Sequence, residues 1–97
     1  MFTSKQRSKL RSIAQNIEPI TQVGKNGVGD NLIKSLDTAL EARELIKISV
    51  LDNAENDAKD ISIELATALN AEVVCVIGRK IVLYRLSHKK GITHIEY

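Results

Sequence analysis

The segment from Val73 to Arg85 limits most strongly what this chain can fold into. Its first part, Val73 to Ile77, is a nearly continuous run of β-branched and apolar residues, which is typical of a central strand buried on both faces. The chain then turns at Gly78-Arg79-Lys80, and the apolar residues of Ile81 to Arg85 predict a returning last strand. The segment therefore predicts a sheet on which helices have to pack.

The rest of the chain alternates between helical and strand periodicity. Helices are expected over residues 3–18, with Thr3 or Ser4 as cap and Pro19 as stop, over about 30–42, with Asp30 as cap, and over about 57–69. Further strands are expected over residues 20–23 and 45–50, the latter half-buried because apolar and polar residues alternate in it. The order α-β-α-β-α-β-β predicts an α/β fold, a compact single-domain sandwich with a four-stranded mixed sheet. Residues 1–97 form this one domain, with a core over about 3–86 and a tail, 87–97, that is either flexible or an added edge strand.

The charge of the chain is unevenly distributed, although its net value is only +2. Residues 1–34 carry six basic side chains against two acidic ones, and residues 35–72 carry nine acidic against three basic. Residues 73–97 return to five basic against one acidic. Two positive ends point to a polyanionic partner, and a solvated mixed surface is the alternative that this distribution leaves open.

Several classes of protein do not fit this composition. The single cysteine, Cys75, excludes an internal disulfide framework and a cysteine-based zinc cluster, and its apolar neighbours predict a small buried side chain. The chain has no run of ~18 apolar residues and its N-terminus lacks the apolar core of a signal peptide, so we expect a cytoplasmic protein with no membrane association. His88 and His94 have no acidic partner nearby except Glu96, which gives no basis for a metal site or a catalytic triad. We therefore expect no enzyme activity, no cofactor or metal and no small-molecule substrate.

A glycine-rich stretch separates the first expected strand from the second expected helix: Gly24-Lys25-Asn26-Gly27-Val28-Gly29-Asp30. Glycines let the backbone approach another molecule closely, and the free N–H groups of a helix start attract anions. A nucleotide-binding P-loop is excluded, because its lysine follows the last glycine whereas Lys25 precedes Gly27, and no Ser or Thr is in place for magnesium. Two interpretations remain, a plain Asn-Gly turn and a G-x-x-G loop that clamps a nucleic-acid backbone.

Basic side chains accompany this loop in two groups. The first expected helix carries four cations with no acidic residue before Glu18 to pair with them: Lys5, Arg7, Lys9 and Arg11. The second group surrounds the last turn and strand: Arg79, Lys80 and Arg85. Both groups fit phosphate contacts, and a solvated charged surface is the alternative. Tyr84 either stacks on a base or belongs to the core.

Three of these motifs resemble the CRM domain family (chloroplast RNA splicing and ribosome maturation) in its stand-alone bacterial, YhbY-like form. Val23-Gly24-Lys25-Asn26-Gly27 is similar to the family's G-x-x-G loop, and Leu45 to Ile48 to its second strand after a polar pair such as Arg43-Glu44. The stretch from Ile77 to Arg85 is similar to the closing V-I-G-x-x-x-V-L-Y-R signature, so that the resemblance covers roughly residues 3–86. The chain departs from the family at Gly29, where Thr or Ser is common, and this shifts the expected helix cap to Asp30.

The resemblance implies RNA binding, association with precursors of the large ribosomal subunit, and a fold similar to the C-terminal domain of translation initiation factor three. By position, the loop residues Gly24, Lys25, Asn26 and Gly27 inherit the family's RNA contact. We therefore expect a non-catalytic protein that binds large-subunit ribosomal RNA in pre-ribosomal particles and assists ribosome assembly. The alternative is a protein-interaction adaptor whose acidic middle region is the working surface.

Overall fold

The structure is a computed structural model that describes residues 2–92 and 94–97. Its helices and strands follow one another in the predicted order, and the predicted α/β class is confirmed. The elements are α1 (Ser4–Ala14), β1 (Thr21–Val23), α2 (Asp30–Arg43), β2 (Leu45–Val50), α3 (Ala58–Leu69), β3 (Glu72–Ile77) and β4 (Lys80–Tyr84).

The four strands form one mixed sheet in the order β1-β2-β4-β3. β1 runs parallel to β2, and the other two pairs are antiparallel. The expectation that residues 73–77 form a central strand is wrong, because β4 takes the central place and β3 lies at the edge, with Ile77 48% exposed. The apolar run in β3 has another cause, since both α1 and α3 pack on this strand and its side chains meet apolar neighbours on either face.

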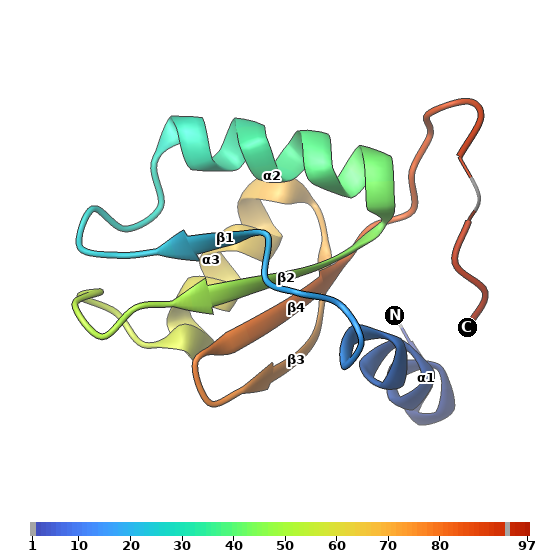
Figure 1. The fold of residues 1–97 in the computed structure, drawn as a ribbon, viewed down its shortest axis with the longest axis horizontal. Helices are drawn as coiled ribbons and strands as arrows, with labels where there is room; N and C mark the ends of the chain where they lie inside the picture. Colours follow the sequence, from blue (N-terminus) through green and yellow to red (C-terminus); the bar gives the residue numbers. More distant parts are fainter. Residues whose placement is uncertain (1, 93) are drawn as a thin grey trace.

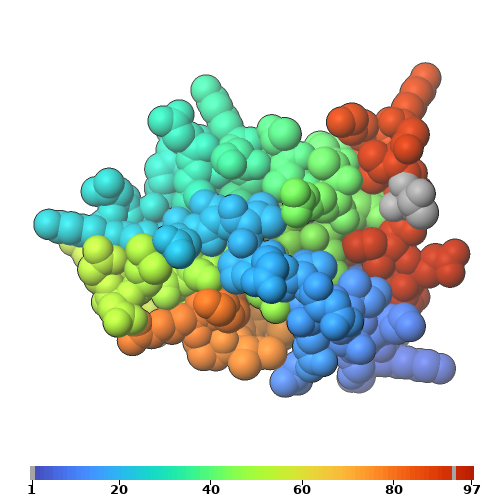
Figure 2. All heavy atoms as spheres, viewed as in Figure 1, coloured from blue at the N-terminus to red at the C-terminus, as the bar shows by residue number. Residues whose placement is uncertain are grey.

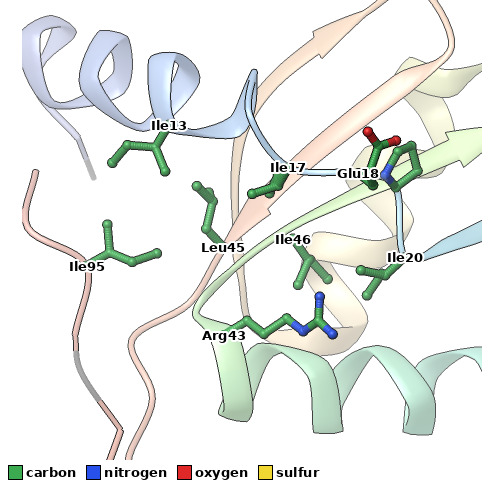
Figure 3. A pocket seen from close by; sticks show the side chains of 9 residues that line it. Ile13, Ile17, Glu18, Ile20, Arg43, Leu45, Ile46 and Ile95 are labelled. Atoms are coloured by element: carbon green, nitrogen blue, oxygen red, sulfur yellow. The ribbon is translucent and has the colours of Figure 1, made fainter.

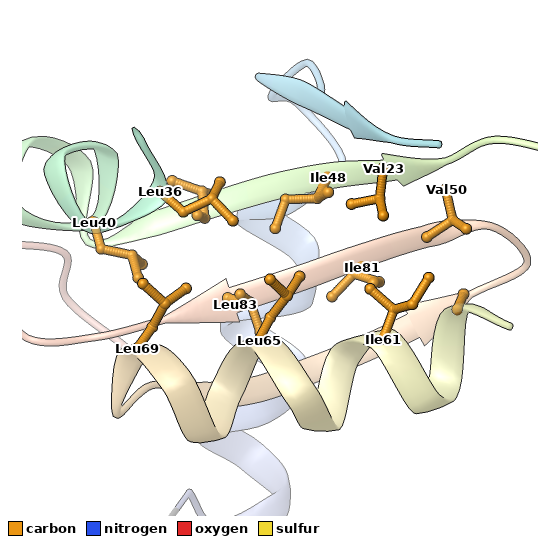
Figure 4. Close-up of a cluster of buried hydrophobic side chains, with 12 residues drawn as sticks. Val23, Leu36, Leu40, Ile48, Val50, Ile61, Leu65, Leu69, Ile81 and Leu83 are labelled. Atoms are coloured by element: carbon orange, nitrogen blue, oxygen red, sulfur yellow. The ribbon is translucent and has the colours of Figure 1, made fainter. Parts of the chain in front are cut away.

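α2 and α3 cover one face of the sheet and form the larger core with it (Figure 4). The fully buried side chains of this core include Leu36 and Leu40 of α2, Leu65 of α3, and Ile48 and Ile81 of the central strands. Burying a Leu or Ile side chain contributes about 1.5–3 kcal/mol, so this layer supplies most of the driving force for folding.

α1 packs on the opposite face, where Leu10 and Ala14 contact Leu45, Val82 and other apolar side chains of the sheet. This second core corrects the expectation for β2. Five of its six residues are buried, not every second one, because helices lie on both of its faces. The alternation of apolar and polar residues in β2 instead indicates the face of the sheet to which each side chain points. Lys47 and Ser49 point to the face on which α1 packs.

The helix ends partly differ from those expected. Thr3 caps α1 through a capping box with Gln6, as the sequence indicates. The helix ends at Ala14, well before Pro19, because the backbone continues through i→i+3 hydrogen bonds into a turn. The N-cap of α2 is Gly29 and not Asp30, which is the first helical residue. In that position the Asp30 carboxylate favours the helix through its dipole.

The described residues after β4 contain no helix or strand, so the predicted alternative of an added edge strand is wrong for them. The tail is held by the carboxylate of Glu44, which accepts hydrogen bonds from the Ser87 N–H (2.8 Å) and the Ile95 N–H (2.8 Å) and lies 2.7 Å from Nδ1 of His94. Glu44 is fully buried and has a φ of 65°, in the left-handed region. Burial alone would raise the pKa of Glu44, but these hydrogen bonds outweigh it and lower that pKa.

The long axis of the molecule separates two ends (Figure 1). The loop after β1 and the loop after β2 lie at one end, and α1 and the tail lie at the other, near the N-terminus. On the face seen in Figure 2, residues near position 20 (blue) and the β3–β4 hairpin (orange) reach the surface between these ends.

Candidate nucleic-acid interface

The glycine loop is a turn that leads directly into α2. The N–H of Gly27 donates to the carbonyl of Gly24 (3.0 Å), and Gly27 has a φ of 65°, which glycine adopts without strain. Lys25 and Asn26 at the tip are exposed. The first hydrogen bond of α2 runs from the Ile33 N–H to the Gly29 carbonyl, and no side chain caps the N–H groups before it. These N–H groups can donate hydrogen bonds to an anion.

The loop packs against the segment that follows β2. A Cβ at Gly24 would lie 3.3 Å from Cδ1 of Leu51 and 3.4 Å from Oδ1 of Asn53, so a larger residue would require the Leu51 side chain to shift slightly. Glycine at position 24 is therefore explained by close packing, and glycine at position 27 by its positive φ. The two glycines fit both interpretations of the loop, and the case for a nucleic-acid contact rests on the exposed tip, Lys25 and Asn26.

Carboxylates restrict how a polyanion can reach the loop. Asp52, Glu55 and Asp57 line a depression of about 510 Å³ between the loop after β2 and the β3–β4 turn. Arg79 lies in the same depression, and its guanidinium pairs with Asp52. Because like charges repel, these carboxylates disfavour the approach of a phosphate chain from the side of this loop relative to the side of the sheet.

The four predicted cations of α1 divide into two kinds. Lys5, Lys9 and Arg11 are exposed. Arg7 departs from the expectation of a free basic face, because its Nη1 donates to the carbonyls of Val73 and Val74, both at 2.7 Å. These carbonyls lie at an irregularity in the β3–β4 pairing, which leaves them available. The guanidinium of Arg7 therefore holds α1 on β3.

Arg85 also differs from the expectation of a flanking RNA contact. Its side chain is 16% exposed, and its guanidinium bonds Asp37 (2.8 Å) and Glu41 (3.1 Å) of α2 and the carbonyl of Leu69 at the end of α3 (2.8 Å). These contacts join two helices to the end of β4. Lys80 remains exposed and donates to the hydroxyl of Ser49 (2.7 Å).

Tyr84 belongs to the core, which decides between the two alternatives that the sequence left open. It is 4% exposed, and its ring packs edge-to-face on Phe2 and Tyr97 with centroid distances of 5.6 and 5.0 Å. Burial, together with a hydrogen bond to Tyr97, raises the pKa of the Tyr84 hydroxyl. A buried ring cannot serve as a stacking platform for a base.

The structure adds one cation that the sequence analysis did not select. Lys47 of β2 lies beside Arg11 of α1 and Lys80 of β4 in a small depression of about 140 Å³ with Cys75. Burial raises the pKa of the Cys75 thiol, and the charges of Arg11, Lys47 and Arg7 oppose that rise. The sequence contains one signal for this site. Lys47 and Ser49 occupy alternate, polar positions of β2, and their side chains therefore share one face of the sheet.

The acidic middle region does not form one free surface. Asp37 and Glu41 bind Arg85, Glu44 is buried, Asp52 pairs with Arg79, and Asp57 caps α3. Five of the nine carboxylates counted in residues 35–72 therefore have partners within the fold. This weakens the alternative of an adaptor that uses an acidic face.

Other features of the described residues suggest no different chemistry. Within residues 2–92 and 94–97, no group of three or more His, Cys, Asp or Glu side chains is placed to hold a metal ion. No helix in the described ranges is both long and apolar enough to cross a membrane. A depression of about 600 Å³ lies between α1, the start of β2 and the tail and is lined mainly by isoleucines (Figure 3). The charges of its two ionisable side chains, Arg43 and Glu18, are opposite, so the net charge of its lining is zero. It lacks the excess positive charge that a polyanion needs.

Comparisons with known proteins identify the family. The model of the CRS1 / YhbY (CRM) domain matches residues 2–85. The chain is 52% identical to probable RNA-binding protein YqeI of Bacillus subtilis over 90% of this chain and 91% of that protein, and 31% identical to a Haemophilus influenzae protein named RNA-binding protein, over 94% and 92%. The solution structure of SAV1595 from Staphylococcus aureus matches with a TM-score of 0.77 at 49% identity, over 93% of this chain and 94% of that one. This chain therefore belongs to the CRS1 / YhbY (CRM) domain family.

Proposed function

We propose that this chain is a non-catalytic RNA-binding protein of the cytoplasm that associates with ribosomal RNA in large-subunit precursors and assists their assembly. The observation that carries the proposal is the glycine loop, with its exposed Lys25 and Asn26 and the uncapped start of α2 directly behind them. The names of the relatives in Bacillus subtilis and Haemophilus influenzae support an RNA partner. The choice of large-subunit ribosomal RNA rests on the family resemblance of the loop and the closing strand.

The loop contacts phosphates and not base edges in this proposal. Backbone N–H groups and a lysine position an RNA chain but carry no sequence information, so selectivity comes from RNA shape or unpaired bases. Lys5, Lys9, Arg11 and Lys80 are exposed and add positive charge, whereas Arg7 and Arg85 are engaged inside the fold. Affinity for single-stranded RNA should fall with salt, with a log–log slope of about −0.7 for each phosphate neutralised.

The test is a charge reversal at the tip of the loop. Lys25→Glu should weaken RNA binding, measured by fluorescence anisotropy, and leave the melting temperature unchanged, because the side chain is exposed. Lys89→Glu makes the same charge change in the exposed tail at the opposite end of the molecule and serves as the control. Equal losses in both variants would show that only net charge matters, and a joint fall of affinity and melting temperature would make the loop structural.

The ribosomal part of the proposal has its own experiment. Tagged protein should sediment with large-subunit precursors in a gradient of cell lysate, and nuclease treatment should release it. Association that survives nuclease and depends on a protein partner would favour the adaptor alternative.

A further inference from the structure

α1 covers only part of its face of the sheet. Its apolar residues contact the rows of the sheet that contain Leu45, Val82 and Tyr84. The next row runs from Gln22 across Ser49 and Lys80 to Ile77, as the strand register shows. Side chains at these paired positions point to the same face, and the row lies toward the end of the sheet that carries the glycine loop.

Two depressions follow this uncovered row. One, of about 140 Å³, lies beside α1 and has Arg11, Lys47 and Lys80 around Cys75. The other, of about 700 Å³, lies beside the segment before β1 and contains Glu18, Gln22, Ser49 and Lys80. Lys80 belongs to both, so they form one strip across the sheet, which we call the sheet groove.

The sheet groove has the charge of a polyanion site. Among the described residues that line it, three cations face the single carboxylate of Glu18: Arg11, Lys47 and Lys80. Lys47 is half-buried on the floor, where burial strengthens its interaction with a phosphate relative to an exposed lysine. The ion pairs found elsewhere in the described chain engage Arg79, Arg85 and His94 and none of these three cations.

We propose that the sheet groove binds a single strand of RNA, whose phosphates contact Arg11, Lys47 and Lys80 and whose path continues to the glycine loop. This inference rests on the proposed function and specifies its partner as unpaired RNA. A single strand can enter a narrow depression and reach Lys47, whereas a duplex, with phosphates on its rim, can contact only exposed side chains. The carboxylates of the loop around Asp52 disfavour the other approach to the glycine loop, which makes the groove the favoured route.

No Phe or Tyr is among the described residues that line the groove. The three aromatic rings of the chain, Phe2, Tyr84 and Tyr97, pack on one another at the end with the tail. The RNA is therefore held through phosphates and an apolar floor of Cys75 and Ile77, which tolerates any base sequence.

Cys75, the single cysteine, gives a test in the unmodified protein. Its rate of alkylation by iodoacetamide is measured alone, with a ~12-nucleotide single-stranded RNA, and with a duplex of the same length, each at a concentration that saturates the protein by anisotropy. Single-stranded RNA should suppress alkylation strongly and the duplex should not. Equal protection by the duplex, or by poly-glutamate as a model of an acidic protein segment, would overturn the proposal.

Charge removal gives a second readout. The triple variant Arg11→Gln, Lys47→Gln and Lys80→Gln should reduce the salt slope by about 2 and the affinity at 0.1 M salt by about 100-fold, since each lost contact contributes about 5-fold. Lys59→Gln on α3, on the opposite face of the sheet, is the control. If RNA binds and depends on Lys25 while Cys75 stays reactive, the groove is refuted and the proposed function stands. If neither form of RNA binds, the proposed function itself fails.

Discussion

Replacing Glu44 by glutamine tests whether one buried carboxylate holds the tail to the domain. The two oxygens of Glu44 accept from the N–H groups of Ser87 and Ile95 and from His94. A carboxylate only accepts, so Nδ1 of His94 carries the proton in this contact. Glutamine keeps the shape of the side chain but turns one acceptor into a donor. At least one backbone N–H then faces an NH₂ group with no partner.

The expected loss follows from the kind of bonds involved. A hydrogen bond to a charged group contributes about 1.5–3 kcal/mol, and an unsatisfied buried donor costs about 1–3 kcal/mol. Because glutamine retains one acceptor, we expect the free energy of unfolding to fall by about 2–3 kcal/mol. For a domain of this length, that lowers the melting temperature by roughly 10–20 °C.

Urea denaturation followed by circular dichroism measures the loss, and hydrogen exchange at the amides of Ser87 and Ile95 locates it. Both amides should exchange faster in the variant by a larger factor than amides of the central strand β4. Glu64→Gln, on an exposed position of α3, is the matched control and should change stability by less than about 0.5 kcal/mol. If the two variants are equally stable, the carboxylate does not anchor the tail and the reasoning is refuted.

Three further predictions concern stability. The advantage of the wild type over Glu44→Gln should be present above the ordinary carboxyl pKa of 4.5 and shrink as the pH falls through the lowered folded-state pKa, because the unfolded chain binds a proton first; denaturation curves from pH 7 to 3 check the direction. Leu65→Ala, in the fully buried core, should cost about 2–5 kcal/mol in urea denaturation, while Ile63→Ala, 57% exposed on the same helix, should cost less than 1 kcal/mol. Thr3→Ala removes the side chain that accepts from the Gln6 N–H and should cost about 0.5–2 kcal/mol, measured by thermal unfolding; no loss would mean that the capping box does not stabilise α1.

Periodicity predicted the order of the elements because each helix or strand is defined by neighbouring residues. The order of the strands in the sheet is a different matter. β3 and β4 are apolar runs of similar length, and β4 is central because Leu45 to Ser49 of β2 pair with it. No local pattern identifies that pairing. The helix cap at Gly29 was missed for a related reason, since Asp30 has the better capping side chain but lies one residue inside the helix.

The candidate site was predicted in its parts but not in its arrangement. The loop tip, Lys25 and Asn26, is exposed as expected. The engagement of Arg7 and Arg85 inside the fold could not be predicted, because their partners, such as Val73 for Arg7 and Asp37 for Arg85, lie far away in the sequence. The burial of Glu44 could not be predicted from the sequence, because the N–H groups that its carboxylate binds lie in the tail, far along the chain.

Side-chain geometry explains why two of the arginines, Arg7 and Arg85, are engaged inside the fold. A guanidinium offers five donors in a planar fork, so one side chain can bond several fixed carbonyl and carboxylate oxygens at once, as Arg7 and Arg85 do here. A lysine ammonium is a point charge on a flexible stem, which suits a phosphate chain that has no fixed register. In the proposed interface, three lysines, Lys25, Lys47 and Lys80, contact the mobile RNA together with one exposed arginine, Arg11. An interface built in this way depends on the number of phosphates within reach and not on their sequence, and for this reason the salt slope is its most direct signature.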